Sequence, residues 1–325
     1  MIRYAILGTS WIAEEFFRAA QGTELALAAV CSRTEERGRA FAAKLGQPGL
    51  PVCLTPEALA ADNTIQAVYI ASPNVCHAPQ SELLLRAGKH VLCEKPVVLH
   101  PDDLRRLQTI AKEHGLIFME AIMFLHTPAR RTVIEALPRL GGVTSVCFDF
   151  SQRSSRCGAL RGGEIHNVFR PEMGGGAWND LGIYCLYPLL DLFGPPQDIF
   201  FRTHSLPTGV DGSGAALLRF PGFPAALTFS KTGQSRGVSQ IMGEEGTITI
   251  QSIAQFQGIW LYDRSGAAEA LAPPLQKHET MQYEARAFCD YILGRGSAVP
   301  CARASQLALQ TAEWMERARQ SQKYS

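Results

Sequence analysis

The sequence has almost no excess charge and no long apolar run. Its 31 lysines and arginines stand against 30 aspartates and glutamates, which leaves a formal net charge of +1. A chain without a basic surplus offers no general surface to a polyanion, so we expect no nucleic-acid partner. No apolar stretch approaches the roughly 18 residues of a membrane span, so we expect no membrane partner. Glu14 and Glu15 follow the first apolar segment closely, which argues against a signal peptide.

The cysteines also lack the spacing that structural sites require. There are nine, an odd number, and no two of them form a C-x-x-C pair. Such a pattern disfavours a disulfide framework and a zinc site. No group of His, Cys, Asp and Glu has metal-ligand spacing in the sequence. We therefore expect reduced thiols, no metal and a cytoplasmic location.

The first 120 residues alternate short apolar segments with segments of helical period. The 325 residues suffice for about two domains. Short apolar strands between helices predict an α/β Rossmann domain, a doubly wound parallel sheet covered on both faces. The expected strands are 2–7, 25–31, 51–53, 67–72, 90–94 and 116–120. The expected helices are 11–20, 34–45, one from about 56, 78–87 and 101–113.

The pattern changes after residue 120. Helices near 127–138 and 180–193 flank a strand at 143–152, and six strand-like runs follow between 197 and 263. Helices near 281–293 and 303–319 end the chain. This order predicts an α+β domain with a mostly antiparallel sheet. We expect a nucleotide-binding domain at 1–121 and a substrate and oligomerisation domain at 122–325. Packing of the C-terminal helix back onto the first domain stays open.

The turn after the first strand lacks two of the three glycines of a dinucleotide-binding fingerprint. Gly8 matches, while Ser10 and Ala13 occupy the other two positions. A strand–turn–helix of this kind points backbone N–H groups and the positive end of the helix at a pyrophosphate. The expected cofactor contacts in this turn are Gly8, Thr9, Ser10, Trp11 and Ile12.

The second strand lacks the terminal carboxylate that would accept from the 2′-hydroxyl of NAD. Ser32 and Arg33 stand there instead, and Arg37 follows one helical turn later. Hydroxyl and guanidinium groups suit a 2′-phosphate, because arginine offers a rigid fork of donors. The sequence thus favours NADP(H), with NAD(H) as the second option. The alternative is that both arginines are solvated residues of a helix start.

Two further motifs carry chemistry. Glu94-Lys95-Pro96 follows the fifth strand, and ligands of doubly wound folds bind beyond the carboxyl ends of the strands. In the second domain a glycine-rich run opens a helix on which Asp180 and Tyr184 are four residues apart. That spacing places them on one face of an α-helix.

Together these motifs resemble the glucose–fructose oxidoreductase / inositol dehydrogenase family (Gfo/Idh/MocA) along the whole chain. The landmarks are the Gly8 turn, Ala71-Ser72-Pro73-Asn74 with His77, Glu94-Lys95-Pro96, the glycine-rich segment with Asp180 and Tyr184, and the turn 243–247. The resemblance implies a Rossmann domain and a second domain with an open, mostly antiparallel sheet. It also implies a nicotinamide cofactor, no metal, and sugar, cyclitol or polyol substrates.

The resemblance implies residue roles as well. Lys95 is expected to contact substrate and nicotinamide ribose, and Asp180 is the substrate-side carboxylate. Tyr184 stands where many members have histidine, which is similar to the dihydrodiol dehydrogenase branch, where tyrosine donates the proton. The further cofactor contacts that the resemblance implies are Ala71, Ser72, Asn74, His77, Glu94, Arg170 and Tyr283.

The expected chemistry agrees with the residue types. A phenol with a pKa near 10 is a poor acid at neutral pH, and a nearby ammonium lowers that pKa. Lys95 would supply this effect for Tyr184 and would stabilise negative charge on a reacting oxygen. The alternatives are a surface role for Lys95, core packing for Tyr184 and a helix-start role for Asp180. His166 is the next candidate for proton transfer.

The predicted function is hydride transfer between NADP(H) and a sugar, polyol or dihydrodiol-type alcohol or carbonyl. Two alternatives stay open: a non-catalytic cofactor-binding sensor, and a lyase or hydrolase that oxidises transiently with recycled NAD. The expected partners are a small-molecule substrate and a second copy of the chain, in a homodimer or larger homo-oligomer. Ile248, Ile250 and Trp260 are expected on the exposed sheet face that would join the copies.

Overall fold

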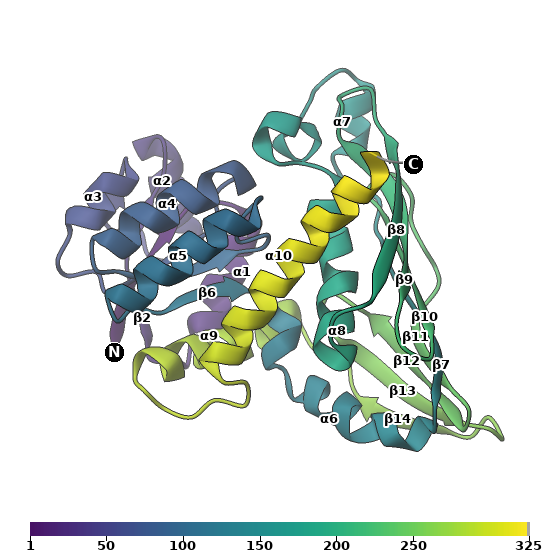
Figure 1. Cartoon of the computed structure of the whole chain (residues 1–325). Helices are drawn as coiled ribbons and strands as arrows, with labels where there is room; N and C mark the ends of the chain where they lie inside the picture. Colours follow the sequence, from purple (N-terminus) through teal and green to yellow (C-terminus); the bar gives the residue numbers. More distant parts are fainter. Residues whose placement is uncertain (324–325) are drawn as a thin grey trace. The chain divides into compact units, whose positions relative to one another are not determined.

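The computed structural model describes residues 1–323, which divide into two compact units. Residues 1–126 and 276–309 form the first unit. Residues 127–275 and the segment from 310 onward form the second. The long helix α10 (Cys301–Lys323), drawn in yellow in Figure 1, runs from the first unit into the second.

The first unit contains a six-stranded parallel sheet in the order β3-β2-β1-β4-β5-β6. This is the strand order of a Rossmann fold, so the predicted fold class is confirmed. The strands are nearly continuous apolar segments because helices cover both faces of the sheet. Their bounds are β1 (Ile2–Leu7), β2 (Leu25–Cys31), β3 (Val52–Cys53), β4 (Ala67–Ile70), β5 (His90–Glu94) and β6 (Phe118–Ala121).

The helices of this unit follow the strands, and one further helix returns from the end of the chain. They are α1 (Trp11–Ala20), α2 (Glu35–Lys44), α3 (Pro56–Ala61), α4 (Asn74–Arg86), α5 (Pro101–Glu113) and α9 (Lys277–Ile292). Helix α9 packs on α1, and its Met281 and Phe288 join Phe16 and Tyr69 in one buried core. The ring of Phe16 stacks on that of Tyr69, with 3.8 Å between centroids. Helix α9 therefore completes the hydrophobic core of the first unit.

The second unit contains an eight-stranded sheet in the order β14-β13-β12-β11-β7-β10-β9-β8. Only the central β7–β10 pair is parallel, which confirms the mostly antiparallel sheet. The bounds are β7 (Val143–Ser151), β8 (Asp198–Ser205), β9 (Asp211–Arg219), β10 (Pro224–Ser230), β11 (Ser239–Gly243), β12 (Gly246–Ser252), β13 (Gln257–Asp263) and β14 (Ala268–Ala272).

One face of this sheet is covered by helices. Helix α8 (Ile183–Phe193) packs on β7 and β10, with α6 (Pro128–Ala136) beside the β13–β14 edge (Figure 1). Phe148 and Leu227 point to this side and are buried, because side chains of a strand alternate between faces. The short helix α7 (Cys157–Arg161) lies in the loop after β7.

The opposite face carries large apolar side chains that stay exposed. Phe200, Leu217 and Trp260 are 53%, 57% and 42% exposed. The expectation for Ile248 and Ile250 was wrong, since both are fully buried on the covered face. In β12 the isoleucines alternate with threonines, and Thr249 pairs with Trp260 of β13. The face that holds Trp260 therefore carries the threonines of β12.

Three findings concern the cysteines, metal binding and membrane spans in the described part of the chain. All nine cysteines are free thiols. Within residues 1–323 we find no cluster of three His, Cys, Asp or Glu side chains that could bind a metal ion. No helix in this part of the chain combines the length and apolar character of a membrane span.

Candidate active site

The fingerprint turn lies close against the neighbouring strand. Gly8 has φ +106°, and a Cβ at this position would lie 2.7 Å from the carbonyl oxygen of Ala71. Only glycine meets both constraints without strain. Ser10 precedes α1, and its hydroxyl donates to the same carbonyl at 3.4 Å. The first N–H groups of α1 are thereby presented beside the turn, in the arrangement that binds a pyrophosphate.

A cavity of about 460 Å³ lies between this turn and one face of α2, which lines it from Arg37 to Lys44. Thr9, Ser10 and Trp11 line it from the turn, and Arg37 lines it from α2. Arg33 is also exposed, while Ser32 is buried and donates its N–H to the carbonyl of Cys53 at 3.0 Å. The structure thus brings three of the five predicted turn residues and one predicted phosphate-binding arginine to a single cavity. These residues fit an anionic dinucleotide.

His77 joins two of the predicted loops from beneath. It is 1% exposed, and its two ring nitrogens lie 2.9 Å from the carbonyl oxygen of Ser72 and 2.8 Å from that of Pro96. Burial lowers the pKa of its imidazole. The Ser72 hydroxyl in turn donates to Gln80 at 2.6 Å. His77 therefore ties the main chain of the loop after β4 to that of the loop after β5.

Glu94 and Lys95 belong to a group of charged residues at the carboxyl end of β5. The hydroxyl of Tyr69 donates to Glu94, which is 9% exposed, and burial raises the pKa of this carboxyl. Lys277, at the start of α9, is held by burial and by the charge of Lys95 at a lowered pKa. Its ammonium lies 4.9 Å from the ring centroid of Trp11. This places a second cation beside the fingerprint turn.

Glu284 lies on α9, seven residues after Lys277 and next to Tyr283, a predicted cofactor contact. It is 1% exposed, and burial raises the pKa of its carboxyl well above the ordinary value. Glu94 is the charge that adds to this shift. Sequence reasoning missed Lys277 and Glu284. Their signal was the spacing of seven residues, which puts both on one helical face with the core residue Met281.

Asp180 lies in a π-helical turn rather than in an α-helix. The turn spans Trp178–Gly182, and α8 begins only at Ile183. The expected α-helical spacing therefore does not extend through Asp180. Asp211 accepts from the backbone N–H of Trp178 and fixes the start of the turn, while the indole N–H donates to Met315 at 3.1 Å. Single π turns of this kind often occur at functional sites.

The carboxylate of Asp180 forms an ion pair with Lys231, which sequence reasoning also missed. The Lys231 side chain is only 3% exposed, whereas that of Asp180 is 38% exposed. Lys231 follows β10 directly, and its backbone N–H donates to Gly212 at 2.8 Å. The carboxylate of Asp180 is therefore open to solvent while it stays paired with a buried ammonium.

Tyr184 lies in the first turn of α8 and is 8% exposed. Its ring meets that of Phe150 edge to face, with 5.4 Å between centroids. Arg170 and His166 lie in the preceding loop. Arg170 is exposed and donates to the Ile165 carbonyl at 2.9 Å, and His166 lies 3.1 Å from Glu164. Lys95 belongs to the first unit, whereas Asp180 and Tyr184 belong to the second.

The fold and these residues define an oxidoreductase with a dinucleotide-binding Rossmann domain. Residues 2–122 match the model of the oxidoreductase family with an NAD-binding Rossmann fold, and residues 137–249 match the Gfo/Idh/MocA C-terminal domain. The chain belongs to the Gfo/Idh/MocA family, as its motifs predicted.

Known relatives agree with this assignment. The chain is 39% identical over 293 residues to the scyllo-inositol 2-dehydrogenase (NADP(+)) IolU of Bacillus subtilis, covering 90% of this chain and 88% of that protein. It is 29% identical over 270 residues to mouse trans-1,2-dihydrobenzene-1,2-diol dehydrogenase, covering 80% and 75%. A 3-ketoreductase from Actinomadura kijaniata, crystallised with NADP and TDP-benzene, superposes with a TM-score of 0.84 at 26% identity, covering 98% and 97%. The predicted family and branch are confirmed.

Proposed function

We propose that this chain is an NADP(H)-dependent oxidoreductase that acts on a sugar, polyol or dihydrodiol-type alcohol or carbonyl. The observation that carries the proposal is the cavity in which the fingerprint turn meets Arg37. A basic side chain at that position suits a 2′-phosphate. Relatives named as NADP(+)-dependent scyllo-inositol and dihydrodiol dehydrogenases support the cofactor and the substrate class.

The cofactor, when bound, supplies or accepts the hydride. Gly8 and the N-terminus of α1 would hold its pyrophosphate, because the turn leaves no space for a side chain there. Ser32, Arg33 and Arg37 would hold the 2′-phosphate. The ammonium of Lys277 lies against the ring of Trp11 and interacts with the carboxyl of Glu94, so both charged groups would lie near the bound cofactor.

The second set of residues would bind substrate and move the proton. Tyr184 donates a proton to the reacting oxygen in carbonyl reduction and accepts it in alcohol oxidation. Lys95 stabilises the negative charge that develops on this oxygen. Asp180, more than a third exposed, accepts hydrogen bonds from substrate hydroxyl groups.

A cofactor-absorbance screen tests this function. The panel contains cyclitols, sugars, dihydrodiols and nucleotide-linked ketosugars, each with NADP(H) and NAD(H). We expect net oxidation or reduction of NADP(H) with at least one polyhydroxylated compound. Cofactor binding without any turnover would make the chain a sensor. Product without net change of cofactor would make it a lyase or hydrolase.

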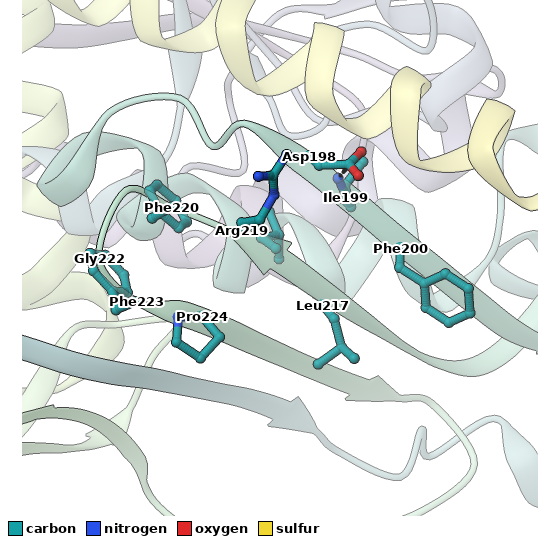
Figure 2. Close-up of a pocket in the computed structure, with 10 residues that line it drawn as sticks. Asp198, Ile199, Phe200, Leu217, Arg219, Phe220, Gly222, Phe223 and Pro224 are labelled. Carbon is teal, nitrogen blue, oxygen red and sulfur yellow. Dashed lines mark hydrogen bonds between the residues drawn. The ribbon is translucent and has the colours of Figure 1, made fainter.

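We also propose a cytoplasmic homodimer or larger assembly joined through the open face of the eight-stranded sheet. One row of paired residues crosses that face on all eight strands: Phe200, Leu217, Ala226, Cys147, Gln240, Thr249, Trp260 and Ala270. A cavity of about 490 Å³ hollows the β8–β10 edge, where Figure 2 shows Phe200 and Leu217 on neighbouring strands. Exposed apolar surface of this kind usually marks an interface. The free thiols suit a reducing compartment.

A further inference from the structure

Lys231 is a buried cation at the end of a strand whose inward side chains are otherwise apolar. Its whole residue is 2% exposed, and its ammonium contacts the carboxylate of Asp180. Removing an ammonium from water is expensive unless it is paired and hydrogen-bonded. Hydrophobic residues of similar size in place of both partners of such a pair would often be neutral or stabilising. The charge therefore calls for a reason other than packing.

The main chain of Lys231 is fixed on both sides. Its N–H donates to the carbonyl of Gly212 at 2.8 Å, and its carbonyl accepts from the N–H of Ser154 at 2.8 Å. The thiol of Cys157 donates to the same carbonyl at 3.2 Å. The main chain from which the lysine side chain extends is thus fixed by two other segments of the second unit, β9 and the loop after β7.

Lys231 also interacts with a second carboxylate, which belongs to Asp211 at the start of β9. Its charge acts on Asp211, and Asp211 accepts from the N–H of Trp178 at the start of the π turn. Asp180 lies two residues further along that turn. The ammonium therefore interacts with one carboxylate that anchors the turn and one that the turn presents toward solvent.

We propose that Lys231 is a positioning residue that holds Asp180 as an ionised, immobile acceptor for substrate hydroxyl groups. Asp180 then takes no proton during turnover, and proton transfer is left to Tyr184. Because an ionised acceptor needs a donor, the site selects substrates with a hydroxyl group beside the reacting carbon. This inference rests on the proposed oxidoreductase function and specifies its substrate class.

The test compares Lys231→Met, Lys231→Arg, Asp180→Asn and the double variant on a polyhydroxylated substrate from the screen and on its analogue without the neighbouring hydroxyl. Lys231→Met should lower kcat/KM for the full substrate by about 10- to 100-fold, the effect of one charge-assisted hydrogen bond. It should barely change kcat/KM for the analogue or the Kd of NADP(H). Lys231→Arg keeps the charge and should recover most of the loss.

The double variant shows whether Lys231 acts through Asp180. In the Asp180→Asn background, Lys231→Met should change kcat/KM by less than about threefold, because coupled residues are not additive. This variant removes both charges, so it also stays informative if Lys231→Met alone does not fold. Fully additive losses would refute the proposal.

Arg130→Met is the matched control. It breaks the ion pair between Arg130 on α6 and Asp191 on α8, whose side chains are 17% and 0% exposed. We expect a lower midpoint of unfolding and an unchanged kcat/KM. If Lys231→Met shows the same pattern, Lys231 is only structural and the proposal fails. Wild-type enzyme without NADP(H) turnover on the whole panel would instead refute the proposed function.

Discussion

Removal of the two arginines near the cavity beside the fingerprint turn should weaken the binding of NADP(H) selectively. Arg37 lines the cavity with Thr9 and Ser10, and Arg33 precedes α2. A hydrogen bond to a charged group contributes about 1.5–3 kcal/mol. Both side chains are exposed, so solvent screening places each effect at the low end of that range. At about 1.4 kcal/mol per tenfold, each alanine should raise the Kd of NADPH about tenfold.

The assay is the Kd of NADPH and of NADH, measured by fluorescence titration on wild type, Arg33→Ala and Arg37→Ala. NADH lacks the 2′-phosphate, so its Kd should stay within about threefold, well below the loss of one charged contact. Added salt should weaken NADPH more than NADH, because exposed charges are screened. Arg39→Ala is the control, since Arg39 lies on the same helix but pairs with Glu35 at 2.7 Å. Equal wild-type affinities for the two cofactors, or equal losses for both, would refute the reasoning.

Three further expectations concern catalysis, stability and assembly. Tyr184→Phe keeps the ring against Phe150 and should lower kcat by about 10²–10⁴ at unchanged cofactor Kd; a kcat within about threefold of wild type would move proton transfer elsewhere. Burial holds the pKa of Glu284 above its unfolded value near 4.5, so its contribution to stability is present at low pH and is lost as pH rises. Glu284→Gln should therefore reduce the fall of the unfolding free energy with rising pH. An unchanged pH profile of the unfolding free energy would contradict this expectation. Leu217→Lys with Phe200→Lys should shift sedimentation toward the monomer, while a monomeric wild type at micromolar concentration would exclude the proposed interface.

The first unit was predictable because its strands are apolar on both faces. Segments such as 2–7 and 67–70 have no polar alternation, which occurs only where helices cover a sheet on both sides. The handedness of the crossovers then leaves few arrangements, and the observed strand order is one of them. The glycine at position 8 identified the nucleotide turn for a local reason, since its φ and the close carbonyl of Ala71 are both features of the turn itself.

The second unit was less predictable, because its sheet depends on pairings between distant segments. The strand β14 (Ala268–Ala272) was missed, since its small and mostly exposed residues give no alternating pattern. The face of Ile248 and Ile250 was assigned wrongly for a related reason. Their buried side follows from the register with β11 and β13, and a sequence period of two fixes alternation without fixing which face is covered.

The charged residues around the predicted site show where sequence reasoning ends. Lys95, Asp180 and Tyr184 stand in recognisable motifs, whereas Lys231 follows a strand like any solvated lysine and carries no motif. Its main chain is held by hydrogen bonds with Gly212 and Ser154, which only the folded chain brings to it. A local sequence pattern therefore identifies a candidate substrate-binding side chain more easily than it identifies the residue that holds that side chain in place. Under the mechanism that we propose, Lys231 keeps Asp180 ionised as an acceptor for hydroxyl groups, so the Lys231 variants test that mechanism more sharply than Asp180 variants alone.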